Sequence, residues 1–108
     1  GILYLSRPED CQGGTDFFLH RATNSDRFPV TQEELAASGY ATFEEAHKAI
    51  IDGEGTKAEA WQPLTHIPMR YNRLLLLRPW LWHTAGPGFG DKPENGRLVY
   101  LMFFLAKP

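Results

Sequence analysis

The sequence predicts a mainly β fold of the α+β class with a short helical insertion. Apolar and aromatic runs typical of strands lie near both ends of the chain, whereas residues 24–62 are richer in Glu, Ala, Lys and Gly. The chain has 108 residues, 43% of them hydrophobic and 13% aromatic, which is enough for one modest core and is atypical of disorder. We therefore expect residues 1–108 to form a single domain.

The first block, residues 2–21, is predicted to be two strands joined by a turn. Residues 2–5 are a short apolar run, and residues 7–10 contain the proline and acidic residues that favour turns. Residues 15–20 have the β-branched and aromatic character of a strand. The pair Gly13-Gly14 that precedes them permits close approach of another backbone or of a ligand.

Residues 24–62 are predicted to form a two-helix insertion on the surface. Thr31 and Thr42 are each followed three residues later by glutamate, which is the capping-box pattern of a helix start. Gly39 is a typical end for the first helix, and the second is expected to end in residues 52–55, which include two glycines.

The third block, residues 64–108, is predicted to be rich in strands. An extended run is expected at 64–69. The four consecutive leucines within residues 72–78 favour a strand covered on both faces. A corner dense in aromatic residues follows at 79–84, and residues 85–96 contain enough glycine and proline to require a loop. A long strand is expected over residues 97–105.

Charge and cysteine content exclude several classes of function. Eleven basic and thirteen acidic residues give a net charge of −2, so we expect neither nucleic acid nor an anionic membrane as a partner. The one cysteine, Cys11, excludes an internal disulfide and any CxxC metal site. No apolar run is long enough to span a bilayer and no signal peptide is visible, so we expect a soluble, cytoplasmic protein.

Two residues are candidates for chemistry. His83 follows an apolar strand beside a glycine-rich loop, where a neutral imidazole is able to ligate iron, zinc or copper; the ordinary alternative is a histidine bonded to a loop carbonyl. Arg97 opens an otherwise apolar strand, where its planar guanidinium suits a carboxylate ligand. The ordinary alternative for Arg97 is a solvated side chain paired with Glu94 or Asp91.

The order of these residues resembles the C-terminal half of the iron- and 2-oxoglutarate-dependent dioxygenases, of the prolyl-hydroxylase kind. The segments that carry the resemblance are Leu3-Tyr4-Leu5-Ser6 followed by Gly13-Gly14-Thr15-Asp16-Phe17, then Asn72–Leu77 with Trp82-His83, and finally Gly96-Arg97-Leu98 with Phe103-Phe104-Leu105. The resemblance does not extend to residues 24–62.

The resemblance implies a partial double-stranded β-helix (jelly roll, cupin-like) and a chain that is a fragment of a larger domain. It implies that His83 is the distal metal ligand and that Arg97 binds the far carboxylate of 2-oxoglutarate. The intact parent would hold Fe(II) in a triad of two histidines and one carboxylate and hydroxylate a C–H bond of an unknown substrate. The insertion at residues 24–62 would then form part of a substrate lid.

The chain departs from this family at the proximal metal ligands. None of His20, His47, His66 and His83 begins the H-x-D or H-x-E motif, which is expected upstream of the Ile2 strand. One histidine does not hold iron where three protein ligands are needed. We therefore expect this isolated chain to be catalytically inactive, with Fe(II) and 2-oxoglutarate bound by the intact parent. The alternative is a metal-free, cupin-like binding or interaction module.

Other residues have weaker expectations. Asp16 and His20 lie four positions apart on one strand and share a face, which puts them within possible reach of the metal region. His66 is expected to be a packing residue, His47 a solvent-exposed residue of a helix, and Cys11 an unreactive thiol. A partial β-helix would leave the Ile2 strand and its neighbours with unpaired edges, so we expect a homodimer through exposed strand edges.

Overall fold

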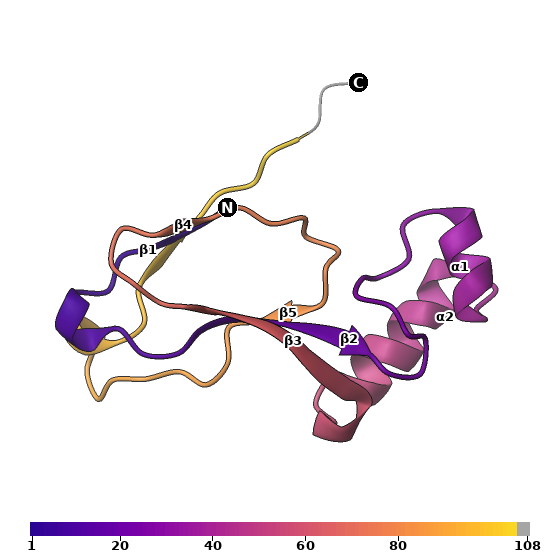
Figure 1. The fold of residues 1–108 in the computed structure, drawn as a ribbon, viewed down its shortest axis with the longest axis horizontal. Coiled ribbons are helices and arrows are strands. Elements are labelled where there is room, and N and C mark those ends of the chain that lie inside the picture. Colours follow the sequence, from indigo (N-terminus) through magenta and orange to yellow (C-terminus); the bar gives the residue numbers. More distant parts are fainter. Residues whose placement is uncertain (106–108) are drawn as a thin grey trace. The chain divides into compact units, whose positions relative to one another are not determined.

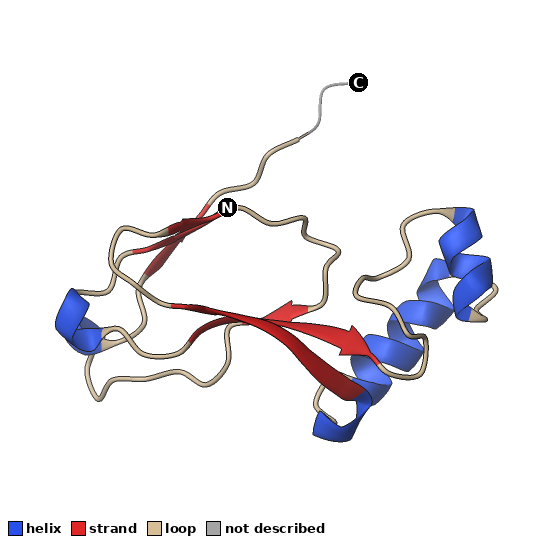
Figure 2. Cartoon of the chain, viewed as in Figure 1, coloured by secondary structure: helices blue, strands red, loops and turns tan. Residues whose placement is uncertain are grey.

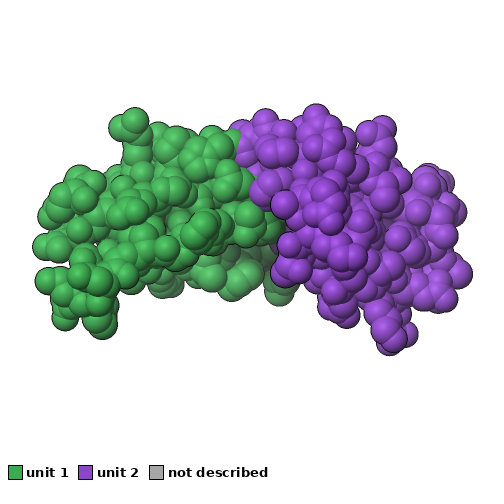
Figure 3. All heavy atoms as spheres, turned by 90° about the horizontal axis from the view of Figure 1, so that it is seen from below, with its two compact units in different colours: residues 1–16, 66–78, 83–108 green, residues 17–65, 79–82 purple. Residues whose placement is uncertain are grey.

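The computed structural model of the protein describes residues 1–105 and divides into two compact units. Unit 1 contains residues 1–16, 66–78 and the described residues from 83 onward, and unit 2 contains residues 17–65 and 79–82 (Figure 3). Two three-stranded sheets and two α-helices make up most of the regular structure of the described residues (Figure 2). The predicted α+β, mainly β class is therefore confirmed.

One sheet lies within unit 1. It contains β1 (Ile2–Tyr4), β4 (Leu74–Leu75) and β6 (Val99–Leu101) in the antiparallel order β4-β1-β6 (Figure 1). Leu3 lies opposite Leu74 on one side and opposite Tyr100 on the other. The expectation of an unpaired edge at the Ile2 strand is therefore wrong, because β1 is the central strand.

The other sheet contains β2 (Gly14–His20), β3 (Trp61–Pro68) and β5 (His83–Thr84) in the order β3-β2-β5. The strands predicted at residues 15–20 and 64–69 correspond to β2 and β3. Gly14 has a φ of +155°, and a Cβ at this position would collide with the backbone carbonyl of Ile67. The close backbone approach predicted at Gly13-Gly14 is thus confirmed.

Both predicted helices form, and their caps are those expected. α1 (Gln32–Ser38) begins where the Thr31 hydroxyl accepts a bond from the Glu34 N–H, and it ends at Gly39 with a φ of 88°. α2 (Phe43–His47) is capped in the same way by Thr42 and continues in a wider π-helical turn over Lys48–Asp52. No helix among residues 1–105 is long and apolar enough to cross a membrane.

The helical insertion does more than cover the surface. Leu35 of α1, Ala46 of α2 and Ile50 of the π-helical turn are all buried, with exposed fractions of 2% or less. Together with His20, which is also fully buried, and with Ala60 and Trp82, these side chains belong to the core of unit 2. Short 3₁₀ turns at Pro8–Asp10, Ala58–Ala60 and Pro93–Asn95 complete the regular structure of the described residues.

The leucine-rich strand and the last strand differ from their predictions. The strands predicted over residues 72–78 and 97–105 shrink to the two residues of β4 and the three of β6. Leu74 and Leu76 are 50% and 65% exposed, so this segment is not covered on both faces. A strand is buried on both faces only when an element packs on each of them. Within the described residues, one face of this sheet has no such element.

Candidate carboxylate-binding site

The Arg97 side chain is held by backbone and by an aromatic ring. One guanidinium nitrogen, Nη1, donates to the Gly14 carbonyl over 3.3 Å, and the guanidinium carbon lies 5.6 Å from the centre of the Tyr4 ring. The residue is half-buried. Within residues 1–105, no carboxylate forms an ion pair with Arg97, so the expected alternative of pairing with Glu94 or Asp91 is wrong for this structure.

Tyr4, whose ring packs against this guanidinium, shares a buried hydrogen bond with Thr15. The Tyr4 side chain is fully buried and Thr15 is 1% exposed. Their oxygens lie 2.5 Å apart in a hydrogen bond that joins β1 to β2. Because the Arg97 guanidinium packs over the Tyr4 ring, a cation and a buried hydroxyl pair lie together in unit 1.

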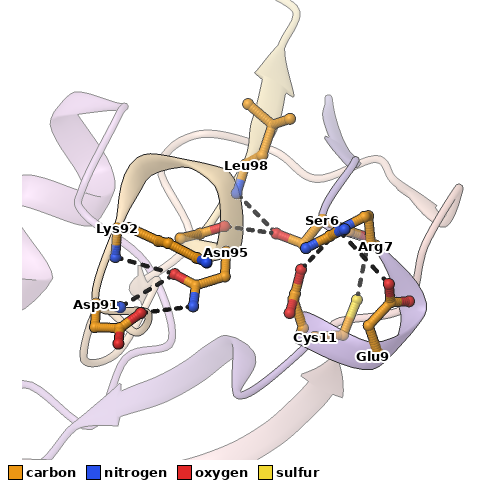
Figure 4. A network of polar contacts seen from close by, with 10 residues as sticks. Ser6, Arg7, Glu9, Cys11, Asp91, Lys92, Asn95 and Leu98 are labelled. Carbon is orange, nitrogen blue, oxygen red and sulfur yellow. Dashed lines mark hydrogen bonds and ion pairs between the residues drawn. The ribbon is translucent and has the colours of Figure 1, made fainter.

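Ser6 fixes the backbone on both sides of Arg97 (Figure 4). The buried Ser6 hydroxyl donates to the Gly96 carbonyl over 3.1 Å and accepts from the Leu98 N–H over 2.9 Å. Arg97 therefore projects from a backbone clamped at its two neighbours.

The turn before Gly96 is ordered by one asparagine. The Asn95 Oδ1 accepts from the N–H groups of Asp91 and Lys92, while Nδ2 donates to Asp91 Oδ1 (Figure 4). The end of the loop predicted at residues 85–96 is thus a structured turn that leads into the Arg97 segment.

His83 begins β5 and is exposed. The Phe18 N–H donates to the Trp82 carbonyl, and the antiparallel register that continues from this bond places Thr84 opposite Asp16. Asp16 Oδ2 lies 3.6 Å from the position of a Cβ on Gly86, two residues beyond Thr84, which agrees with this register. Side chains alternate along a strand, so His83 and Thr84 point to opposite faces of the sheet.

The remaining candidates form separate pairs. Asp16 Oδ1 lies 2.6 Å from Nδ1 of His66, whose side chain is 48% exposed, so the expected packing role of His66 is wrong. His20 instead lies at the other end of β2. Its ring nitrogens contact the Thr23 hydroxyl at 2.8 Å and the Glu54 carboxylate at 3.1 Å. Asp16 and His20 are therefore not brought together.

Two further expectations concern His47 and Cys11. The His47 side chain, on α2, is 57% exposed, as its helical position predicts. The Cys11 thiol donates to the Ser6 carbonyl over 3.4 Å and is half-buried (Figure 4). Its role is structural support of the segment that carries Ser6.

The described residues do not fit an iron centre by themselves. A facial triad needs two histidines and a carboxylate converging on one point. No group of three histidine, cysteine, aspartate or glutamate side chains in residues 1–105 is arranged to hold a metal ion. His83 is the one candidate ligand that the resemblance supplies, and a single imidazole does not complete such a site.

A cavity of about 550 Å³ in unit 2 was not anticipated from the sequence. Its apolar lining includes Leu19 and Ile50, and its polar lining includes Arg27 and Glu34. Arg27 Nη1 lies 3.7 Å from Glu34 Oε1, so this guanidinium, unlike that of Arg97, has a carboxylate partner. Residues 23–27 belong to its lining, but this polar segment carries no motif that indicates a cavity.

Comparison with known proteins gives a family but no activity. A family model described as a family of unknown function, DUF6445, matches residues 1–104. No curated protein and no solved structure matches the chain.

Proposed function

Because the chain belongs to the DUF6445 family, whose function is unknown, we propose a function from its own geometry. The Arg97 site binds a carboxylate of 2-oxoglutarate, and the chain is the C-terminal part of an Fe(II)/2-oxoglutarate-dependent oxygenase that hydroxylates an unknown substrate. Of these functions, we assign only the binding of the co-substrate to this chain; hydroxylation would require the intact parent.

The observation that carries the proposal is the uncompensated charge of Arg97. Half-burial of a cation without an anionic partner is costly, and no carboxylate of residues 1–105 pairs with this guanidinium. The hydrogen bond to the Gly14 carbonyl uses one of its five N–H donors. A ligand carboxylate would accept two parallel bonds from the rest of the planar fork.

Tyr4 and Thr15 support the same assignment. The Tyr4 ring packs against the guanidinium, and its buried hydrogen bond to Thr15 fixes that ring in place. In the oxygenase assignment, His83 would lie toward the 2-oxo acid end of the ligand. The order of the motifs in the sequence agrees with this arrangement.

The second candidate function is a metal-free binding module for a dicarboxylate. It is favoured by one observation, the absence of a three-ligand group among the described residues. Both candidates use Arg97 in the same way and differ in whether a divalent metal strengthens binding.

Isothermal titration of 2-oxoglutarate into the protein tests the proposal, once with Mn²⁺ as a redox-inert metal and once with EDTA. Replacing Arg97→Gln removes a charge-assisted bidentate contact of about 1.5–3 kcal/mol, so we expect a loss of affinity of roughly 10- to 150-fold. The matched control is Arg70→Gln, because Arg70 is an exposed arginine of the same unit. This control should bind like the wild type.

His83→Ala separates the two candidates. If binding is tighter with Mn²⁺ and His83→Ala removes that gain, the oxygenase assignment is supported. If binding is equal with Mn²⁺ and EDTA and is unaffected by His83→Ala, this chain binds the dicarboxylate without a metal, and the same titration of the intact parent protein then separates the two candidates. An Arg97→Gln variant that binds 2-oxoglutarate as tightly as the Arg70→Gln control overturns both.

A further inference from the structure

The sheet of unit 1 has one continuous apolar face. Leu3 of β1 lies between Leu74 of β4 and Tyr100 of β6, and directly opposed residues of a sheet point to the same side. The same alternation brings every second residue of these segments to that side. We call this set the apolar face: Leu3, Leu5, Leu74, Leu76, Leu98, Tyr100, Met102 and Phe104.

An independent observation supports this placement. A Cβ on Gly1 would lie 3.3 Å from Leu76 and 3.5 Å from Phe104, with Met102 also within 3.4 Å. Gly1 is two residues before Leu3 and therefore shares its side of β1. Leu76, which follows β4, and Phe104, which follows β6, therefore both lie beside Gly1, on the side of the sheet that carries Leu3.

The apolar face is open to solvent in the described chain. The exposed fractions of Leu74, Leu76, Leu98, Tyr100 and Phe104 are 50%, 65%, 56%, 59% and 73%. The opposite side of the sheet is covered at Tyr4, which is fully buried, although Leu101 on that side is 54% exposed. No charged residue belongs to the apolar face, although charged side chains are the usual protection of exposed sheets.

The area of this face suits a dimer interface. With side-chain areas of about 150–250 Å² for each aromatic residue and somewhat less for leucine, these exposed fractions leave roughly 550 Å² of apolar surface per copy. This is at the upper end of what a monomer exposes. Two copies packed face to face would bury about 1,100 Å², above the ~1,000 Å² expected of a specific interface.

We propose that the apolar face packs against the same face of a second copy of this chain, as an isologous pair of stacked sheets. Inner faces of packed sheets lie about 10 Å apart, with their side chains interdigitated. The surface is self-complementary in chemistry, because it is apolar throughout, and the net charge of −2 opposes association only weakly. This inference does not depend on the bound co-substrate.

Sedimentation velocity between 5 and 200 μM tests the proposal. We expect a dimer for the wild type and a monomer for Leu74→Glu, which places a charge on the apolar face beside Leu3. Leu64→Glu is the matched control, because Leu64 is also 50% exposed but belongs to unit 2, and it should remain dimeric. Tyr100→Lys is a second variant on another strand of the same face.

A folding control keeps the result interpretable. Circular dichroism identifies which face variant retains the wild-type spectrum, and that variant decides the test. For the wild type alone, the Tm should rise with protein concentration, because association stabilises the folded state by mass action. A wild type that is monomeric at 200 μM with a constant Tm, or a folded Leu74→Glu that dimerises like the Leu64→Glu control, overturns the proposal.

Discussion

Arg97 is positioned by its neighbours in the chain and in the sheet, and none of them neutralises it. Ser6 holds Gly96 and Leu98, the Gly14 carbonyl accepts one N–H, and the Tyr4 ring supports the guanidinium from one side. Packing on an aromatic ring limits the conformations of the side chain. The residue therefore loses little conformational entropy when it receives an anion.

The buried Tyr4–Thr15 hydrogen bond should be measurable as a coupling energy. Tyr4→Phe and Thr15→Val each leave one buried hydroxyl unsatisfied, so each should lower the free energy of unfolding by about 1–3 kcal/mol. The double variant should lose less than the sum of the two, with a coupling of about 1 kcal/mol, in a urea-denaturation double-mutant cycle. Strictly additive losses would mean that the two hydroxyls do not depend on each other.

At the scale of elements, local chemistry in the sequence predicted the helices well. The capping threonines and Gly39 act within one helical turn, so their effect is readable without knowledge of the tertiary structure. The strands were predicted less well. The leucines at 74–77 have the hydrophobicity of a strand that is buried on both faces. Such burial also requires a helix or sheet packed on each face, and the leucine run itself does not show whether one is present.

Gly14→Ala should be among the most destabilising substitutions in the chain. A Cβ there meets the carbonyl and backbone of Ile67, so β2 and β3 must separate, at a cost of about 3 kcal/mol or more. Gly13→Ala is the matched control: its φ is +64° but nothing lies within 4 Å of the added Cβ. It should cost about 1 kcal/mol. Chemical denaturation measures both, and equal losses would contradict the close approach of the two strands.

The helix caps give a milder prediction. Thr31→Ala removes the oxygen that accepts the Glu34 N–H and should cost about 1 kcal/mol, whereas Thr31→Ser should retain most of the stability. Thr56→Ala, an exposed position outside any cap, should be within about 0.5 kcal/mol of the wild type. Thermal unfolding followed at 222 nm makes the comparison. A Thr31→Ala variant that melts like Thr56→Ala would show that this cap does not stabilise α1.

For the whole molecule, the sequence named two site residues, but it did not identify the group that surrounds Arg97. His83 and Arg97 were predicted from residue type and order, whereas Tyr4 and Thr15 come together only when β1 is bonded to β2. That contact joins residues eleven positions apart across a turn. A pattern of residue types does not show which such residues lie close together in the folded chain. The single-domain organisation, the double-stranded β-helix and the homodimer stay predictions.

The central claim is that the Arg97 guanidinium binds the carboxylate of a 2-oxo dicarboxylic acid. A ¹³C NMR titration of uniformly labelled 2-oxoglutarate with the protein tests it most directly, because each carboxylate carbon is observed separately. We predict a saturable shift of the C5 carboxylate that is lost in Arg97→Gln and retained in Arg70→Gln. An unshifted C5 resonance in the wild type, or the same shift in Arg97→Gln, would contradict the account.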